Sequence, residues 1–158
     1  MIAFEIPGEP VGKGRPRFVR ATGRAYTPAK TESYEQRVAM TASAAMAGNL
    51  PWLGPVKLEC RAVYLHPQSW SAKKKARADW KTSKPDADNI LKVVKDALNK
   101  IVFHDDAQVV YATVQKRYGP IAKLVVVVTD LTVPAAEVVG CGVAGAGGES
   151  EVAAGVAL

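Results

Sequence analysis

One segment of the chain has apolar residues at helical spacing, from Asp86 to about Val102. Asp88, Lys92, Lys95 and Asn99 fall on the opposite side. Pro85 disfavours helix before this segment, and Asp86 is suited to the N-cap position. The pattern therefore predicts an amphipathic helix. Its apolar side consists of Ile90, Val93, Val94, Ala97, Leu98 and Ile101.

Alternating or β-branched apolar stretches predict strands elsewhere in the chain. Residues Leu124 to Asp130 are β-branched along most of their length, which is typical of a central strand. Phe18 and Val19 begin a second, short strand after a loop rich in Gly and Pro. The other predicted strands are Ile2 to Ile6, Val56 to His66 and Val109 to Tyr118.

Two further helices are expected. The longer begins at Thr27-Pro28 and runs to about Ala47, with Thr27 as N-cap and Pro28 at the first helical position. The shorter, Ser71 to Trp80, is basic and exposed. The fold class is therefore mixed α/β (α+β), with one domain over residues 1–132, a mixed sheet of about five strands and two main helices. Residues 133–158 are rich in Ala, Gly and Val, which predicts a flexible tail.

Composition narrows the class of protein. A chain of 158 residues that is 48% hydrophobic is expected to form one soluble domain. Its longest apolar run is too short to span a bilayer, and its N-terminus lacks a secretory signal pattern. Cys60 and Cys141 give neither a disulfide framework nor a metal-ligand spacing. These features predict a cytoplasmic protein.

Charge is unevenly placed along the chain. The formal net charge is +6, and all 21 Lys and Arg residues lie at or before Lys123. Three of the 15 acidic residues lie beyond residue 131, so residues 1–131 carry +9. A basic domain suggests a polyanionic partner such as nucleic acid. Charge alone leaves an ordinary basic surface equally open.

Two pairs of aspartates are candidate metal ligands. Asp86 and Asp88 stand at the start of the amphipathic helix, where capping alone is the favoured interpretation. Asp105 and Asp106 follow its other end, and a helix of ~17 residues is about 25 Å long. The tertiary fold must bring the pairs together, through the loop or across a dimer. If they converge, their carboxylates suit Mg²⁺ at a phosphate.

Lys92 stands four residues after Asp88, so the two side chains share a face of the helix. Spacing alone favours an ion pair over a role in stabilising the transition state of phosphate cleavage.

Three motifs together resemble the RusA family of Holliday-junction resolvases over roughly residues 2–131. The first is Lys84-Pro-Asp-Ala-Asp-Asn-Ile-Leu-Lys92, followed by Asp96-Ala-Leu. The second is Asp105-Asp-Ala-Gln-Val109, and the third is the opening segment from Gly8 to Arg17.

The resemblance implies that Asp86, Asp88 and Asp106 are catalytic metal ligands, with Asp105 as an additional candidate. Lys92 matches the essential lysine of the family, which reverses the preference for a simple ion pair. The implied activity is that of a homodimeric endodeoxyribonuclease dependent on Mg²⁺, with Mn²⁺ as a possible substitute. It would resolve four-way DNA junctions by paired nicks in opposed strands, in recombination and repair, and a phage or prophage origin is expected. The alternative is a non-catalytic branched-DNA-binding module of the same fold.

Basic residues are candidates for contacts with DNA phosphates, although each singly could be a solvated surface charge. Phe103 and Trp70 could stack on bases, but a core position is favoured for both. His104 is close to the acidic pair in sequence and is treated as incidental. The basic candidates are Lys13, Arg15, Arg17, Arg20, Arg24, Lys73, Lys74, Lys75, Arg77 and, more weakly, Lys116.

Overall fold

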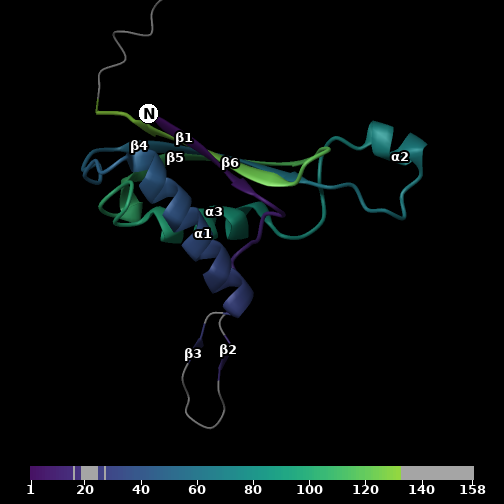
Figure 1. Cartoon of the computed structure of the whole chain (residues 1–158), viewed down its shortest axis with the longest axis horizontal. Coiled ribbons are helices and arrows are strands. Elements are labelled where there is room, and N and C mark those ends of the chain that lie inside the picture. Colours follow the sequence, from purple (N-terminus) through teal and green to yellow (C-terminus); the bar gives the residue numbers. More distant parts are fainter. Residues whose placement is uncertain (16, 19–24, 27, 133–158) are drawn as a thin grey trace, which may run out of the picture.

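The computed structural model describes residues 1–15, 17–18, 25–26 and 28–132 (Figure 1). The expectations for Arg20, Arg24, Thr27 and the tail over residues 133–158 lie outside the described residues. The strands are β1 (Ile2–Pro7), β2 (Arg17–Phe18), β3 (Ala25–Tyr26), β4 (Val56–Tyr64), β5 (Val109–Tyr118) and β6 (Lys123–Asp130). The helices are α1 (Ala29–Met46), α2 (Ala72–Arg77), α3 (Ala87–Leu98) and the 3-10 helix η1 (Asp106–Gln108).

Four strands form the main sheet, in the order β1-β6-β4-β5. β6 lies inside the sheet, as its β-branched composition predicts, and pairs antiparallel with β1 and β4. β4 and β5 are parallel and are joined by a long crossover that contains α2 and α3. β2 and β3 form a separate two-stranded sheet. The mixed α/β class is confirmed, but among the described residues the main sheet has four strands rather than about five, because β2 pairs with β3 outside it.

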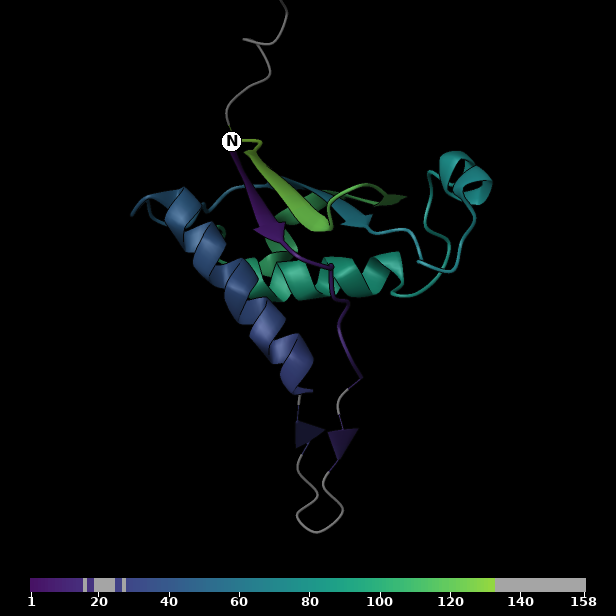
Figure 2. The same ribbon diagram turned by 45° about the vertical axis from the view of Figure 1, so that its right-hand side comes forward.

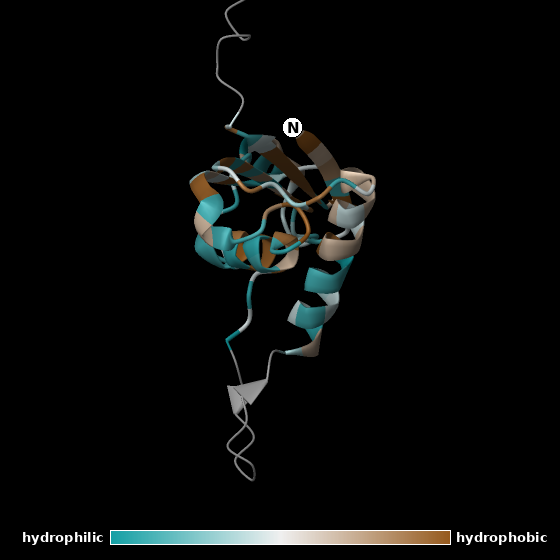
Figure 3. Ribbon diagram, turned by 90° about the vertical axis from the view of Figure 1, so that its left-hand side faces the viewer, coloured by the Kyte–Doolittle hydropathy of each residue, from teal (hydrophilic) through white to brown (hydrophobic). Residues whose placement is uncertain are grey.

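Both main helices lie on one face of the sheet, where they cross each other (Figure 2). Along β4, residues alternate between buried positions that face the helices and more exposed positions on the opposite face. The buried apolar residues of the strands and of both helices form one core, and Figure 3 shows that the strands are rich in hydrophobic residues while much of α1 is hydrophilic. Burial of Cys60 in this core raises the pKa of its thiol to about 12. The domain therefore has one core, between a single sheet and two helices.

The apolar face of α3 is buried as its periodicity predicts, with Ile90, Val93, Val94 and Leu98 fully inaccessible. The helix is shorter than predicted because it ends at Leu98. Lys100 adopts a positive φ of 67°, and its backbone N–H donates to the carbonyl of Phe103 at 2.8 Å. This turn places Phe103 in the core with no exposed surface, so the core interpretation of Phe103 is confirmed.

α1 begins one residue later than the sequence predicts. Pro28 has an extended ψ of 136° and is the N-cap, and Ala29 is the first helical residue. The predicted exposed helix at residues 71–80 is confirmed in shorter form as α2, whose N-cap Ser71 accepts a hydrogen bond from the Lys74 N–H at 3.3 Å. α2 stands on an excursion that projects beyond one end of the sheet (Figure 1). No helix in the described part of the chain is long and apolar enough to cross a membrane.

Candidate metal and DNA-binding site

Asp86 and Asp88 are both exposed at the N-terminus of α3. Asp86 occupies the N-cap position with φ −74° and ψ 152°, yet its side chain makes no capping hydrogen bond. An aspartate that served only as a cap would accept a hydrogen bond from a backbone N–H of the first turn. The Asp86 carboxylate is therefore available for a ligand, in the positive field of the helix N-terminus.

Lys92 lies one turn beyond these carboxylates on α3. Its Nζ is 3.1 Å from Oδ2 of Asp88, and both side chains are well exposed. The hydrogen bond from Lys92 lowers the pKa of the Asp88 carboxyl, which keeps this group ionised. The ion pair expected from spacing is present, and it sets a cation directly beside the carboxylate pair.

The loop before Asp86 is held by Lys116 of β5. The Lys116 ammonium donates to the carbonyl of Ser83 at 2.9 Å and to that of Pro85 at 2.8 Å. These two bonds fix the backbone that enters α3. Lys116, the weaker of the candidates for a phosphate contact, is thus engaged in positioning the start of the helix.

The basic N-terminal segment packs against the same end of α3. The Lys13 N–H donates to the carbonyl of Asn89 at 2.8 Å. Gly12 passes so close to the helix that a Cβ there would lie 2.7 Å from Cβ of Pro85, which explains why glycine is needed. Between this segment and the helix is a cavity of about 670 Å³, lined by Gly12, Lys13, Arg15, Lys84, Pro85, Asp86 and Asn89. Asp86 and several cations therefore share one cavity.

The Lys13 side chain links the two main helices. Its Nζ lies 2.5 Å from Glu35 of α1 and 2.7 Å from Asp96 of α3, and only 27% of the side chain is exposed. A phosphate contact by Lys13 would have to compete with two carboxylates. Arg15 is exposed at the rim of the cavity and has no such partner among the described residues.

Asp105 has a structural role that the sequence interpretation missed. Its carboxylate accepts a hydrogen bond from the Ala107 N–H at 2.8 Å, and the Gln108 side chain accepts one from the Asp105 N–H at 2.7 Å. This is a capping box for η1. Gln108 also donates to the carbonyls of Trp52 and Gly54, which anchors η1 to the domain. The signal was present in the sequence, as an Asp followed three residues later by a Gln.

Asp106 lies beside the middle of α3. Its Oδ2 is 3.3 Å from Nζ of Lys95, which follows Asp88 and Lys92 on the same helix face. Lys95 is seven positions after Asp88 in the helix, so the two positions are about 10 Å apart along the helix axis. In the described parts of the chain, no group of three or more His, Cys, Asp or Glu side chains is placed to hold a metal ion. One chain therefore places Asp86 and Asp88 at the N-terminus of α3 and Asp106 beside Lys95, farther along the helix.

The ligand chemistry of the Asp86 and Asp88 pair fits Mg²⁺. Mg²⁺ is commonly held by one or two carboxylates, with water and phosphate oxygens completing an octahedron. Asp86 and Asp88 are both exposed, and the Asp86 side chain makes no capping hydrogen bond, so the two carboxylates meet that requirement.

The projecting excursion carries the second basic region. Lys73, Lys74 and Arg77 are exposed, and Lys75 is half-buried. Trp70 is half-buried in an aromatic cluster, 5.3 Å from the ring of Tyr118, with the Lys74 ammonium 4.2 Å from its own ring centroid. Trp70 is thus mainly a packing residue of the excursion.

Together, these features describe a small α/β domain in which an acidic pair opens onto a cationic surface, as in nucleases. Residues 7–129 match the family model described as Endodeoxyribonuclease RusA, so the chain belongs to the RusA family. It is also 37% identical over 139 residues to the uncharacterized protein YqaN of Bacillus subtilis (strain 168). That similarity covers 83% of this chain and 97% of YqaN.

Proposed function

We propose that the protein is a Mg²⁺-dependent endonuclease that resolves four-way DNA junctions by paired nicks in opposed strands. Membership of the RusA family implies nuclease action on branched DNA junctions. The observation that carries the proposal to this chain is the N-terminus of α3, where the Asp86 carboxylate makes no cap hydrogen bond and the exposed Asp88 carboxylate lies beside Lys92. In this role the protein would serve DNA recombination and repair in the cytoplasm, and Mn²⁺ would substitute for Mg²⁺.

Asp86 and Asp88 would hold the ion through carboxylate oxygens. Bound Mg²⁺ would offset charge on the scissile phosphate and lower the pKa of a water molecule. The Lys92 ammonium, 3.1 Å from Asp88, would then lie close to a phosphate held by the ion. From that position it can donate a hydrogen bond to an oxygen that gains charge in the transition state.

The basic surface would position the DNA. Arg15 and Lys84 line the same cavity as Asp86, and the exposed cations of α2 extend the positive surface beyond the sheet. Contacts of this kind with phosphates set register and orientation rather than sequence preference. Arg17 and Arg20 remain candidates for the same role.

A homodimer supplies the symmetry that paired nicks require. A four-way junction has approximate two-fold symmetry, and a C2 dimer presents two identical sites to equivalent strands. Asp106 is proposed as the third ligand. Asp106 pairs with Lys95, whose position is about 10 Å along α3 from that of Asp88. It would therefore reach the other two ligands by movement of η1 or from the partner chain.

The first prediction concerns metal-dependent cleavage. Purified protein should nick a synthetic four-way junction in Mg²⁺ and not in EDTA, and Asp88→Asn should bind the junction with little change but cut it at least about 100-fold more slowly. Glu59→Gln is a matched control, because Glu59 is an ion-paired carboxylate on the opposite face of the sheet. Gel assays of binding and cleavage provide the measurement. Unchanged cleavage by Asp88→Asn would contradict the proposed mechanism.

The same assay tests the alternative of a non-catalytic branched-DNA-binding module. That alternative predicts that wild-type protein binds the junction in preference to linear duplex and leaves it uncut in Mg²⁺ or Mn²⁺. Both functions predict that affinity falls steeply with salt, because phosphate contacts release counterions.

A further inference from the structure

We infer that the side chain of Asn89 is an oxygen ligand of the ion that Asp86 would hold, an inference that rests on the proposed Mg²⁺-dependent cleavage. Asp86 is the N-cap of α3, and Asn89 is the third helical residue. The side chains at these two positions of a helix start lie side by side, as they do in a capping box. Asn89 is half-buried and lines the same cavity as Asp86.

Two helix starts in the described chain have the residues of a capping box, but only one of them forms its bonds. At the start of η1, Asp105 and Gln108 exchange both side-chain to backbone hydrogen bonds. At the start of α3, Asp86 makes no side-chain capping bond, and none of the side-chain hydrogen bonds among the described residues involves Asn89. Both side chains at the start of α3 are therefore left free to bind a ligand.

Asn89 is held in the wall of the cavity by contacts of its backbone and Cβ. Its carbonyl accepts a hydrogen bond from the Lys13 N–H at 2.8 Å. The N-terminal segment passes so close to the helix that a Cβ on Gly12 would lie 3.2 Å from Cβ of Asn89. These contacts fix the Cα–Cβ bond of Asn89, while its carboxamide makes no hydrogen bond to a described residue. A ligand group that is fixed before the ion arrives gives up little freedom on binding it.

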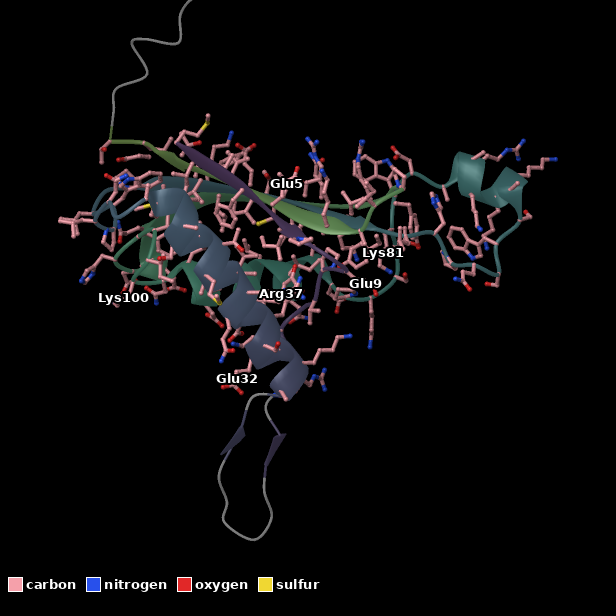
Figure 4. The ribbon with its side chains drawn as sticks, viewed as in Figure 1. Glu5, Glu9, Glu32, Arg37, Lys81 and Lys100 are labelled. Carbon is pink, nitrogen blue, oxygen red and sulfur yellow. The ribbon has the colours of Figure 1, made fainter. Side chains whose placement is uncertain are left out.

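The backbone that carries Asp86 is fixed as well. Lys116 donates to the Ser83 carbonyl at 2.9 Å. The ammonium of Lys81, labelled in Figure 4, donates to the Ser83 hydroxyl at 2.6 Å. The side chains of Asp86 and Asn89 therefore both project from fixed backbone, which limits the separations that their oxygen atoms can adopt.

The other groups around the cavity indicate a cation, rather than a phosphate, as the partner of Asn89. Arg15 and Lys84 line the same cavity and already supply charged donors for a phosphate. What the ion lacks is a further oxygen ligand, because no group of three or more His, Cys, Asp or Glu side chains converges in the described part of the chain. A carboxamide oxygen supplies such a ligand without adding charge, and an Asp and an Asn hold the Mg²⁺ ions of protein kinases.

Binding of Mn²⁺ to the protein without DNA tests the ligand role directly, through the electron paramagnetic resonance signal of the unbound ion. Asn89→Ala should weaken Mn²⁺ binding about 10-fold, because an oxygen ligand is lost. Asn89→Asp keeps an oxygen at that position and adds charge, so it should bind Mn²⁺ at least as tightly as wild type. Gln115→Ala is the matched control for loss of a carboxamide, because Gln115 lines a different cavity together with Glu59.

Two further measurements separate the ligand role from other uses of Asn89. Asn89→Ala should bind the junction in EDTA as tightly as wild type, and its urea midpoint should not fall, because alanine is the better helix former. Weaker junction binding in EDTA with unchanged Mn²⁺ affinity would make Asn89 a phosphate contact and overturn the inference. A lower urea midpoint with unchanged Mn²⁺ affinity would make it a capping residue and would overturn the inference too.

The proposed function and the role of Asn89 can fail separately. Asp86→Asn is the reference variant, and it should weaken Mn²⁺ binding more than Asn89→Ala because it removes a charged ligand. If wild type binds Mn²⁺ and cleaves the junction while Asn89→Ala binds Mn²⁺ equally well, only the role of Asn89 fails. If wild type neither binds Mn²⁺ nor cleaves the junction, the proposed function fails as well.

Discussion

At the scale of single residues, Asp86 distinguishes two uses of an aspartate at a helix start. It holds the N-cap position of α3 without making the cap hydrogen bond, whereas Asp105 makes that bond at the start of η1. Asparagine is about as good an N-cap residue as aspartate but lacks the negative charge. Replacing an aspartate by asparagine at the N-cap therefore separates a structural role of the residue from a role as metal ligand.

We expect Asp86→Asn to leave the free energy of unfolding within about 0.5 kcal/mol of wild type, because no cap bond is lost. Junction cleavage should fall at least about 100-fold, because a charged metal ligand is removed. Asp105→Ala is the contrast, since it removes the bond from the Ala107 N–H and should cost about 1 kcal/mol of stability. Urea unfolding and single-turnover nicking measure the two effects. A loss of stability in Asp86→Ala as large as that in Asp105→Ala would instead assign Asp86 to capping.

At the scale of elements, the contact between β5 and the loop before α3 decides how the site is held. Lys116→Met removes the ammonium that binds the Ser83 and Pro85 carbonyls and should slow cleavage about 10-fold by loosening that loop. It should leave the salt dependence of junction binding unchanged. A lysine that contacts phosphate instead reduces the salt slope by about 1, which we expect for exposed Lys74→Met. Titrations at several salt concentrations compare the two variants, and a reduced slope for Lys116→Met would restore its role as a DNA contact.

Elements were more predictable from the sequence than the contacts between them. The apolar face of α3 and the inner position of β6 follow from local periodicity and composition. Two lysines contact residues that are far apart from them in the chain. Lys13 pairs with Glu35 and Asp96, and Lys116 donates to the carbonyls of the loop before α3. Such contacts depend on how α1, α3 and β5 pack, and spacing carries no information about them. For this reason the sequence alone predicts both lysines as candidate contacts with DNA phosphates.

At the scale of the whole molecule, the sequence alone does not determine how far Asp106 lies from Asp86 and Asp88. The carboxylate pair stands at the N-terminus of the helix, and Lys95 holds Asp106 on the same face farther along. Three carboxylates on one ion need to lie within a few ångströms of one another, because each bond to Mg²⁺ is about 2 Å. If Asp106 is the third ligand, as we propose, it must therefore come from a rearranged η1 or from the second chain of a dimer.

Mixed dimers distinguish these two arrangements. Asp88→Asn and Asp106→Asn are each expected to be inactive alone. If Asp106 acts on the site of the partner chain, a dimer with one copy of each variant retains one intact site, and mixing followed by subunit exchange should restore nicking of a single strand. If each chain supplies all its own ligands, every site in the mixed dimer lacks one carboxylate, and activity stays at the background of the separate variants. Differently tagged copies, purified together and assayed on a junction labelled on each strand, provide the measurement. An Asp88→Asn and Asp86→Asn mixture is the matched control. Asp86 and Asp88 come from the same chain in both arrangements, so every site in this mixed dimer lacks one of them and no activity should return.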